Sequence, residues 1–111
     1  MISGTFTAEA QYSQPVYVPA KMVLDYEILE STATWAAHVR VQRLMVAEGV
    51  TEYPAAGDTG WTTVDEYDMN GATPVAKVSD TAECWFRLAI LTGDFISGVA
   101  TYRMKVVHKV N

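Results

Sequence analysis

The chain has little of the chemistry that covalent cross-links and thiolate metal sites require. Its 111 residues include a single cysteine, Cys84. One thiol excludes an internal disulfide and a zinc site built from several cysteines. A chain that needs no disulfide can fold in a reducing cytoplasm, and we expect this one to be made there.

Signals for export and for membrane insertion are also missing from the sequence. Residues 1–4 carry no basic segment followed by an apolar run, so they do not predict a signal peptide. No stretch approaches the roughly 18 consecutive apolar residues that a transmembrane helix needs. We therefore expect no membrane association.

Charged residues are scarce, and positive ones most of all. Asp, Glu, Lys and Arg make up 19% of the chain, against about 25% in typical domains. Eight basic and thirteen acidic residues give a formal net charge of −5. Because binding to a phosphate backbone requires clustered Lys and Arg, we expect no direct nucleic-acid binding. In so small a domain, the shortage of charge suggests that another protein chain covers some apolar surface.

What the sequence does contain is apolar residues in regular alternation. Hydrophobic residues make up 50% of the chain, and many recur at every second position, as the inward side chains of a β-strand do. Residues 35–44 are the clearest case. A helix is the competing interpretation there because Ala36 and Ala37 favour helices, but the β-branched and aromatic content favours a strand. On one face of this strand we place Trp35, Ala37, Val39 and Val41, and on the other His38, Arg40 and Gln42.

The same alternation predicts about eight short strands separated by turn residues. Pro15 and Pro19 place one of them at a sheet edge, and Pro74 does the same for another, because proline cannot donate to a strand ladder. Residues 45–59 predict a long loop. A chain of this length has room for one domain, residues 1–111, and we predict an all-β antiparallel β-sandwich of jelly-roll or Ig-like type. The predicted strands cover residues 5–9, 16–18, 21–29, 35–44, 61–67, 73–78, 83–91 and 97–110.

No catalytic constellation is recognisable in the sequence. Cys84, His38 and His108 lie on separate predicted strands. A Cys–His nucleophile pair requires contact between the two side chains and a third group that orients the base, and nothing indicates such a group. We therefore expect no catalytic residue, no cofactor and no enzymatic activity.

The acidic segment before Gly71 faintly resembles a calcium loop. It contains Asp65, Glu66, Asp68 and Asn70, but the later bidentate glutamate and the flanking helices of an EF-hand are missing. On a strand Asp65 and Glu66 point to opposite faces. We expect a solvated acidic turn and no metal site.

The three tryptophans and three of the arginines each fit more than one role. Trp35, Trp61 and Trp85 fit a core anchor, an interface residue or a sugar-binding platform. The arginines that interrupt apolar strands fit pairing with Asp and Glu, or contacts to an acidic partner surface. These arginines are Arg43, Arg87 and Arg103.

Over residues 4–104 the order of short motifs resembles small β-sandwich proteins encoded among the structural genes of tailed bacteriophages. One departure is the loop at residues 45–60, which is longer than the short turn found in that group, so contacts made by the loop are not carried over. The motifs that carry the resemblance are Gly-Thr-Phe-Thr-Ala at 4–8, Val-Arg-Val-Gln-Arg at 39–43 after Trp35, Gly-Trp-Thr-Thr-Val at 60–64, Trp-Phe-Arg-Leu at 85–88 and Ser-Gly-Val-Ala-Thr-Tyr-Arg-Met at 97–104.

The resemblance implies a structural role in the virion and supplies no catalytic residue. The leading expectation is a head decoration (cement) protein that binds the major capsid protein on the capsid exterior, as a homo-oligomer such as a trimer. A tail, neck or fibre component is the first alternative, and a carbohydrate-binding adhesion module is the second. Expected partner-binding residues are Phe6 near the N-terminus, Tyr53 in the long loop, and Tyr102 and His108 in the last strand.

Overall fold

A computed structural model of the chain describes residues 1–30, 34–45, 54, 60–70, 75–79 and 83–108. The described residues form strands, turns and bends and contain no helix. The strands build two antiparallel sheets packed into a compact β-sandwich. The all-β fold class predicted from alternation is therefore confirmed.

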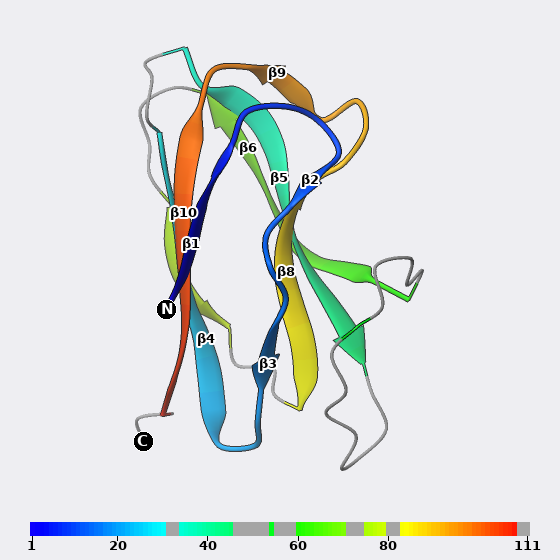
Figure 1. The fold of residues 1–111 in the computed structure, drawn as a ribbon, viewed down its shortest axis with the longest axis vertical. Helices are drawn as coiled ribbons and strands as arrows, with labels where there is room; N and C mark the ends of the chain where they lie inside the picture. Colours follow the sequence, from blue (N-terminus) through cyan, green and yellow to red (C-terminus); the bar gives the residue numbers. More distant parts are fainter. Residues whose placement is uncertain (31–33, 46–53, 55–59, 71–74, 80–82, 109–111) are drawn as a thin grey trace.

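One layer is a four-stranded sheet in the order β1-β10-β4-β7. Its strands are β1 (Ile2–Phe6), β10 (Ala100–His108), β4 (Met22–Glu30) and β7 (Val75–Ser79). In Figure 1 this layer runs down the left side, and the N-terminus lies about halfway down it. Within the described residues β7 pairs only with β4 and is an edge strand.

The second layer is a six-stranded sheet with the central order β2-β8-β5-β6. Two short strands pair at its margins: β3 with β8 and β9 with β5. Figure 1 shows β2, β3 and β8 facing the other layer from the right. The six strands are β2 (Gln11–Tyr12), β3 (Val16–Val18), β5 (Ala36–Met45), β6 (Thr62–Asn70), β8 (Cys84–Ile90) and β9 (Phe95–Ser97).

Most predicted strands are found close to their predicted positions. The proline-bracketed strand is β3 (Val16–Val18), which pairs only with β8 among the described residues, as expected of an edge. The strand that is apolar on both faces is β8, which lies between β2 or β3 on one side and β5 on the other. Its side chains are buried on both faces apart from the half-buried Arg87, which fits its apolar sequence.

The strand predicted over residues 97–110 is found as β10, but its predicted start needs correction and its last two residues lie outside the described residues. The chain forms β9 (Phe95–Ser97), passes Gly98 at a φ of 83°, and then forms β10 (Ala100–His108). Because β9 pairs with β5 and β10 pairs with β4, the chain changes sheets at this point. The left-handed conformation at Gly98 suits a residue without a Cβ atom.

The predicted boundaries of the first strand also need correction. The strand was expected over residues 5–9, but β1 spans Ile2–Phe6. Its inward positions are Ile2, Gly4 and Phe6, and it pairs along β10, where Gly4 lies opposite Tyr102. The small Gly4 leaves room for the Tyr102 ring, which packs against Phe6 at a centroid distance of 4.7 Å.

The core between the layers is built from the alternating positions that the sequence indicated. On β5 and the residue before it, Trp35, Ala37, Val39 and Val41 are all buried. β4 contributes Leu24, Tyr26 and Ile28, and β8 contributes Phe86, Leu88 and Ile90. Burial of these apolar side chains supplies the main driving force for folding.

A polar contact joins the two layers within this core. The Tyr67 hydroxyl of β6 donates to Asp65 Oδ2 at 2.9 Å, and the Tyr26 hydroxyl of β4 lies 2.7 Å from the Tyr67 hydroxyl. Tyr26 is 2% exposed, and burial is the main reason that its pKa is raised. Tyr26 therefore remains protonated and donates across the sandwich.

Candidate interaction face

The outward face of the six-stranded sheet carries an ordered set of polar and aromatic side chains. On β5 the outward positions are His38, Arg40 and Gln42, which alternate with buried residues. On β6 they include Glu66 and Asp68, which lie opposite Arg40 and His38 in the strand register. We call this surface the outer face.

A β-bulge extends the outer face along β6. Val41 pairs with Asp65, but Gln42 pairs with Thr63, so Val64 is an extra residue. Such an insertion shifts the alternation of side chains by one position. Thr63 therefore shares the face of Gln42, and Trp61, two residues earlier, reaches the same surface.

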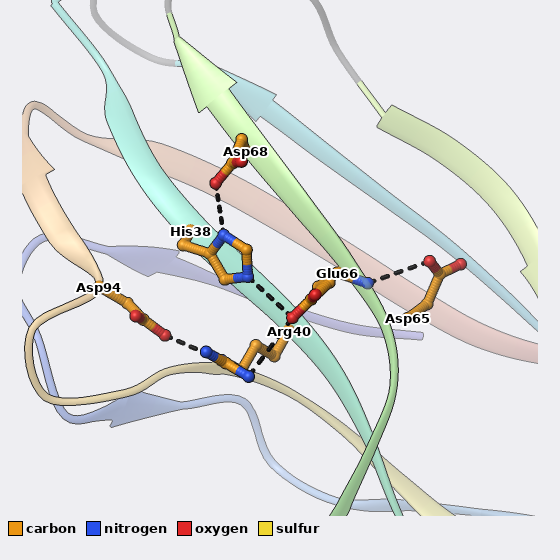
Figure 2. Close-up of polar contacts among 6 residues, drawn as sticks. All are labelled: His38, Arg40, Asp65, Glu66, Asp68 and Asp94. Carbon is orange, nitrogen blue, oxygen red and sulfur yellow. Dashed lines mark hydrogen bonds and ion pairs between the residues drawn. The ribbon is translucent and has the colours of Figure 1, made fainter.

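Five charged side chains at one end of the outer face form what we call the charge cluster: His38, Arg40, Glu66, Asp68 and Asp94. Figure 2 shows His38 between Glu66 and Asp68, and Arg40 between Glu66 and Asp94. His38 Nε2 lies 2.9 Å from Glu66 Oε2, and His38 Nδ1 contacts Asp68 Oδ1. Arg40 Nη1 lies 3.3 Å from Glu66 Oε2, and Arg40 Nε donates to Asp94 Oδ2 at 2.9 Å.

The turn between β8 and β9 brings Asp94 to this cluster. The backbone N–H of Asp94 donates to the Leu91 carbonyl at 3.0 Å, and the His38 N–H donates to the Asp94 carbonyl at 2.8 Å. Gly93 takes a φ of 87°, which suits glycine. Residues 92–93 form this turn, and it holds Asp94 against β5.

The two carboxylates raise the pKa of His38. The larger cause is the hydrogen bond to Asp68, followed by the one to Glu66, while partial burial acts in the opposite direction. Arg40, which shares Glu66 with His38, is the nearby positive charge. The charge cluster therefore favours the imidazolium form of His38.

Replacing His38 with glutamine is expected to flatten the dependence of stability on pH. Since the pKa of His38 is higher in the folded state, its contribution is complete below the unfolded value of about 6.5 and is lost as pH rises through the folded pKa. For a surface pair we expect about 0.2–1 kcal/mol. Urea unfolding of the wild type and of His38→Gln between about pH 6 and pH 8 measures this difference.

His108→Gln is the matched control, because His108 is an exposed residue of β10 in the other sheet. A change of slope that is seen in His38→Gln and not in His108→Gln is assigned to the charge cluster. If His38→Gln has the same slope of stability against pH as the wild type, the carboxylates do not hold His38 in the imidazolium form.

A second group on the outer face surrounds Arg87 of β8, and we call it the arginine stack: Tyr12, Gln42, Trp61 and Arg87. The Arg87 Cζ atom lies 4.1 Å from the Tyr12 ring centroid and 4.3 Å from the Trp61 ring centroid. Arg87 Nε donates to Gln42 Oε1 at 2.9 Å. Burial lowers the pKa of Arg87. The guanidinium is therefore fixed in position by residues from β2 and β5 and by Trp61, the residue before β6.

Two of the residues expected to contact a partner are part of the core. Phe6 is 0% exposed and Tyr102 is 8% exposed. Their rings pack against each other between the layers, so the expectation that they form a binding surface is corrected by their burial. His108 is exposed on β10, and Tyr53 lies outside the described residues.

The acidic segment is part of a strand and not a turn. Asp65, Glu66 and Asp68 all belong to β6, which continues to Asn70. Asp65 and Glu66 do make contacts on opposite faces: Asp65 with Tyr67, and Glu66 with His38. Sequence reasoning missed this pairing because it depends on the register between β5 and β6.

Cys84 and His38 are not brought together. Cys84 is buried and pairs in register with Met45, and His38 lies seven residues earlier in β5, about 23 Å away at about 3.3 Å per residue. Burial raises the pKa of the Cys84 thiol. Its environment is that of a packed, inert cysteine.

The tryptophans and the remaining arginines divide between core and surface. Trp35 is fully buried, as expected of a core anchor, and Trp85 is also buried beside Tyr17. Trp61 is half-buried on the outer face. Arg103 pairs with Glu27 on the four-stranded sheet, which is the ion pair expected for an arginine on a strand.

No group of three or more His, Cys, Asp and Glu side chains in the described residues is arranged to hold a metal ion. The part of the chain that the structure describes contains no helix with the length and apolar character needed to span a membrane. Comparisons with protein-family models, with curated proteins and with solved structures found no match to this chain.

Proposed function

We propose that this chain is a structural protein of a tailed-phage virion, and specifically a head decoration protein that binds the capsid exterior. The observation that carries the proposal is the outer face, where strand-to-strand contacts hold arginine, histidine, carboxylate and aromatic side chains in fixed positions. Arginine, tyrosine and tryptophan are the residues that most often dominate protein–protein binding energy. The resemblance of the motif order over residues 4–104 to phage structural proteins supports another virion protein as the partner.

The sheet edges support the same role. Within the described residues, β6 pairs only with β5 and β7 pairs only with β4. Edge strands present backbone N–H and C=O groups that a neighbouring chain can pair with. Copies of this chain, for example in a trimer, or the major capsid protein would satisfy these groups on the particle.

The mechanism is thermodynamic and requires no catalysis. A protein that binds the assembled shell but not its separated subunits stabilises the shell by mass action. Contacts repeated over a symmetric lattice add up, so a modest affinity at each site is sufficient. The net charge of −5 disfavours the packaged nucleic acid as a binding partner.

Counting the copies of this chain in purified virions tests the proposal. We expect hundreds of copies, because a decoration protein follows the capsid lattice. About six or twelve copies would instead indicate the neck or tail alternative, where rings set the number. Absence of the chain from virions made by the genome that encodes it would refute a virion role.

A carbohydrate-binding module remains a second candidate because Tyr12 is 47% exposed and, like the half-buried Trp61, lies against Arg87. Aromatic rings at a surface can stack on sugars. A saturable change in tryptophan fluorescence on addition of glycans, lost in Trp61→Phe, would favour this function. No change would leave the virion role as the better account.

A further inference from the structure

Four arginines lie on described strands, and the contacts of three of them, Arg40, Arg87 and Arg103, differ. Arg40 pairs with Glu66 and Asp94, and Arg103 pairs with Glu27. Arg87 makes no ion pair with any of the described residues; its contacts are Gln42 and the two rings of the arginine stack. It is therefore a positive charge that the described fold positions but does not neutralise.

The contacts of Arg87 leave one edge of its guanidinium without a partner in the described structure. The Nε–H is used by Gln42, and the rings of Tyr12 and Trp61 lie against the guanidinium carbon. The Nη groups make no hydrogen bond with described residues. Parallel N–H groups on a planar guanidinium match the two oxygens of a carboxylate.

The surroundings of this guanidinium strengthen its attraction for an anion. Partial burial removes water, which increases the energy of a charge–charge contact. Rotation of the side chain is restricted by the two rings and by Gln42, so less entropy is lost on binding. The net charge of −5 opposes the long-range approach of an acidic partner, so the attraction is local to this guanidinium.

From this geometry we infer that the arginine stack binds an aspartate or glutamate side chain of a protein partner. This inference rests on the proposed function, in which the partner is another virion protein, and it supplies the chemistry of the contact. The exposed Tyr12 ring provides the apolar surface beside the carboxylate.

An acidic sugar would offer the same carboxylate, but the polar groups of the stack fit it less well. Gln42 is 5% exposed, and its Oε1 atom is already accepting from Arg87. Sugar hydroxyls need several donors and acceptors at the surface, whereas the stack offers rings and one guanidinium edge. A protein carboxylate with an apolar neighbour is the better match.

Binding to capsids tests the inference. Heads purified from phage that lack this gene are titrated with the wild type, Arg87→Lys, Arg87→Met and the control Arg103→Met. We expect both Arg87 variants to bind about ten-fold or more weakly, as for an interface residue that contributes above about 1 kcal/mol. Lysine keeps the charge but loses the planar stacking and the paired N–H groups.

Arg103→Met removes the same charge from the other sheet and should bind within about two-fold of the wild type, as a residue outside the interface does. Unfolding temperatures of all variants show whether each is folded. Should Arg87→Met fail to fold, Arg87→Lys decides. If the wild type binds heads and the folded Arg87 variants bind equally well, the inference is overturned while the proposed function stands.

A second measurement tests the inference without capsids. It still applies if the wild type does not bind heads, a result that would count against the proposed function. The wild type is titrated with a hexaglutamate peptide, a hexaglutamine peptide and glucuronate, and the NMR signals of the Trp61 indole N–H and the Arg87 Nε–H are followed. We expect shifts with hexaglutamate alone. Shifts at lower concentrations of glucuronate, or none with hexaglutamate, would overturn the inference.

Discussion

Replacing Trp35 with alanine is expected to lower the free energy of unfolding by about 3–5 kcal/mol, the cost of deleting a large aromatic side chain from a core. Trp35 is 0% exposed and packs edge-on against Phe95, with ring centroids 6.4 Å apart. It therefore holds the end of β5 against the strand β9, just before the chain changes sheets. Urea denaturation of the two proteins measures the difference.

Two matched variants make this prediction specific. Trp35→Phe should cost less than Trp35→Ala, because it keeps a ring and removes an indole N–H that finds no hydrogen-bond partner in the described structure. Trp61→Ala should cost less as well, since Trp61 is half-buried on the outer face. A loss below about 1 kcal/mol for Trp35→Ala would show that Trp35 is not the core anchor.

Replacing Gly4 with valine is expected to destabilise the fold by about 1–3 kcal/mol through overpacking. A Cβ atom at Gly4 would contact the Tyr102 hydroxyl and lie 2.7 Å from Tyr102 Cζ, which is closer than van der Waals contact. The Tyr102 ring cannot easily withdraw, because it packs against Phe6 in the core. Thermal and urea unfolding measure the loss.

The control is Ser3→Val, the same new side chain at the adjacent, outward position of β1. It should change stability by no more than about 0.5 kcal/mol. In a double-mutant cycle, Gly4→Val combined with Tyr102→Ala should cost less than the sum of the two single changes, because the truncated residue makes room. Additive costs would mean that Gly4 and Tyr102 do not interact.

The alternating side chains of the strands divide into a buried set and an outward set. The two predictions above concern the buried set, and the outer face is built from the outward set. Inward positions of β1, β5 and β10 form the core, and their loss affects folding. Outward positions of β5, β6 and β8 carry the charge cluster and the arginine stack, and their loss should affect binding more than stability. Measuring both properties for every variant separates the two roles.

The fold was largely predictable because burial on one side of a strand leaves a period of two in the sequence. Residues 35–44 show this directly: the four residues assigned to the core are all buried, and β5 spans Ala36–Met45. The extent of the last strand was misjudged because of a backbone feature. Gly98 divides the last strand at a positive φ, and the sequence alone does not show which sheet each part joins.

Most residues of the candidate site were individually noted from the sequence, but Tyr12 and Asp94 were not, and the grouping was not predicted. His38, Arg40, Glu66 and Asp68 are at alternating positions of two strands, which suggests outward faces and nothing more. Their contacts depend on which residue lies opposite which, and the bulge at Val41 and Gln42 shifts that register by one. Phe6 and Tyr102 were expected at a surface because they are near a terminus and in a final strand, but their apolar rings pair in the core.

The amino-acid sequence by itself determined that the chain is all-β, that it has one cysteine and a net charge of −5, and which face of β5 is buried. These properties follow from local composition and periodicity, which every stretch of chain carries on its own. Only the tertiary structure decided that Arg87 lies against Tyr12 and Trp61, and that His38 lies between Glu66 and Asp68. Those contacts join residues that are distant in sequence. They are set by strand order and register, which no local pattern encodes.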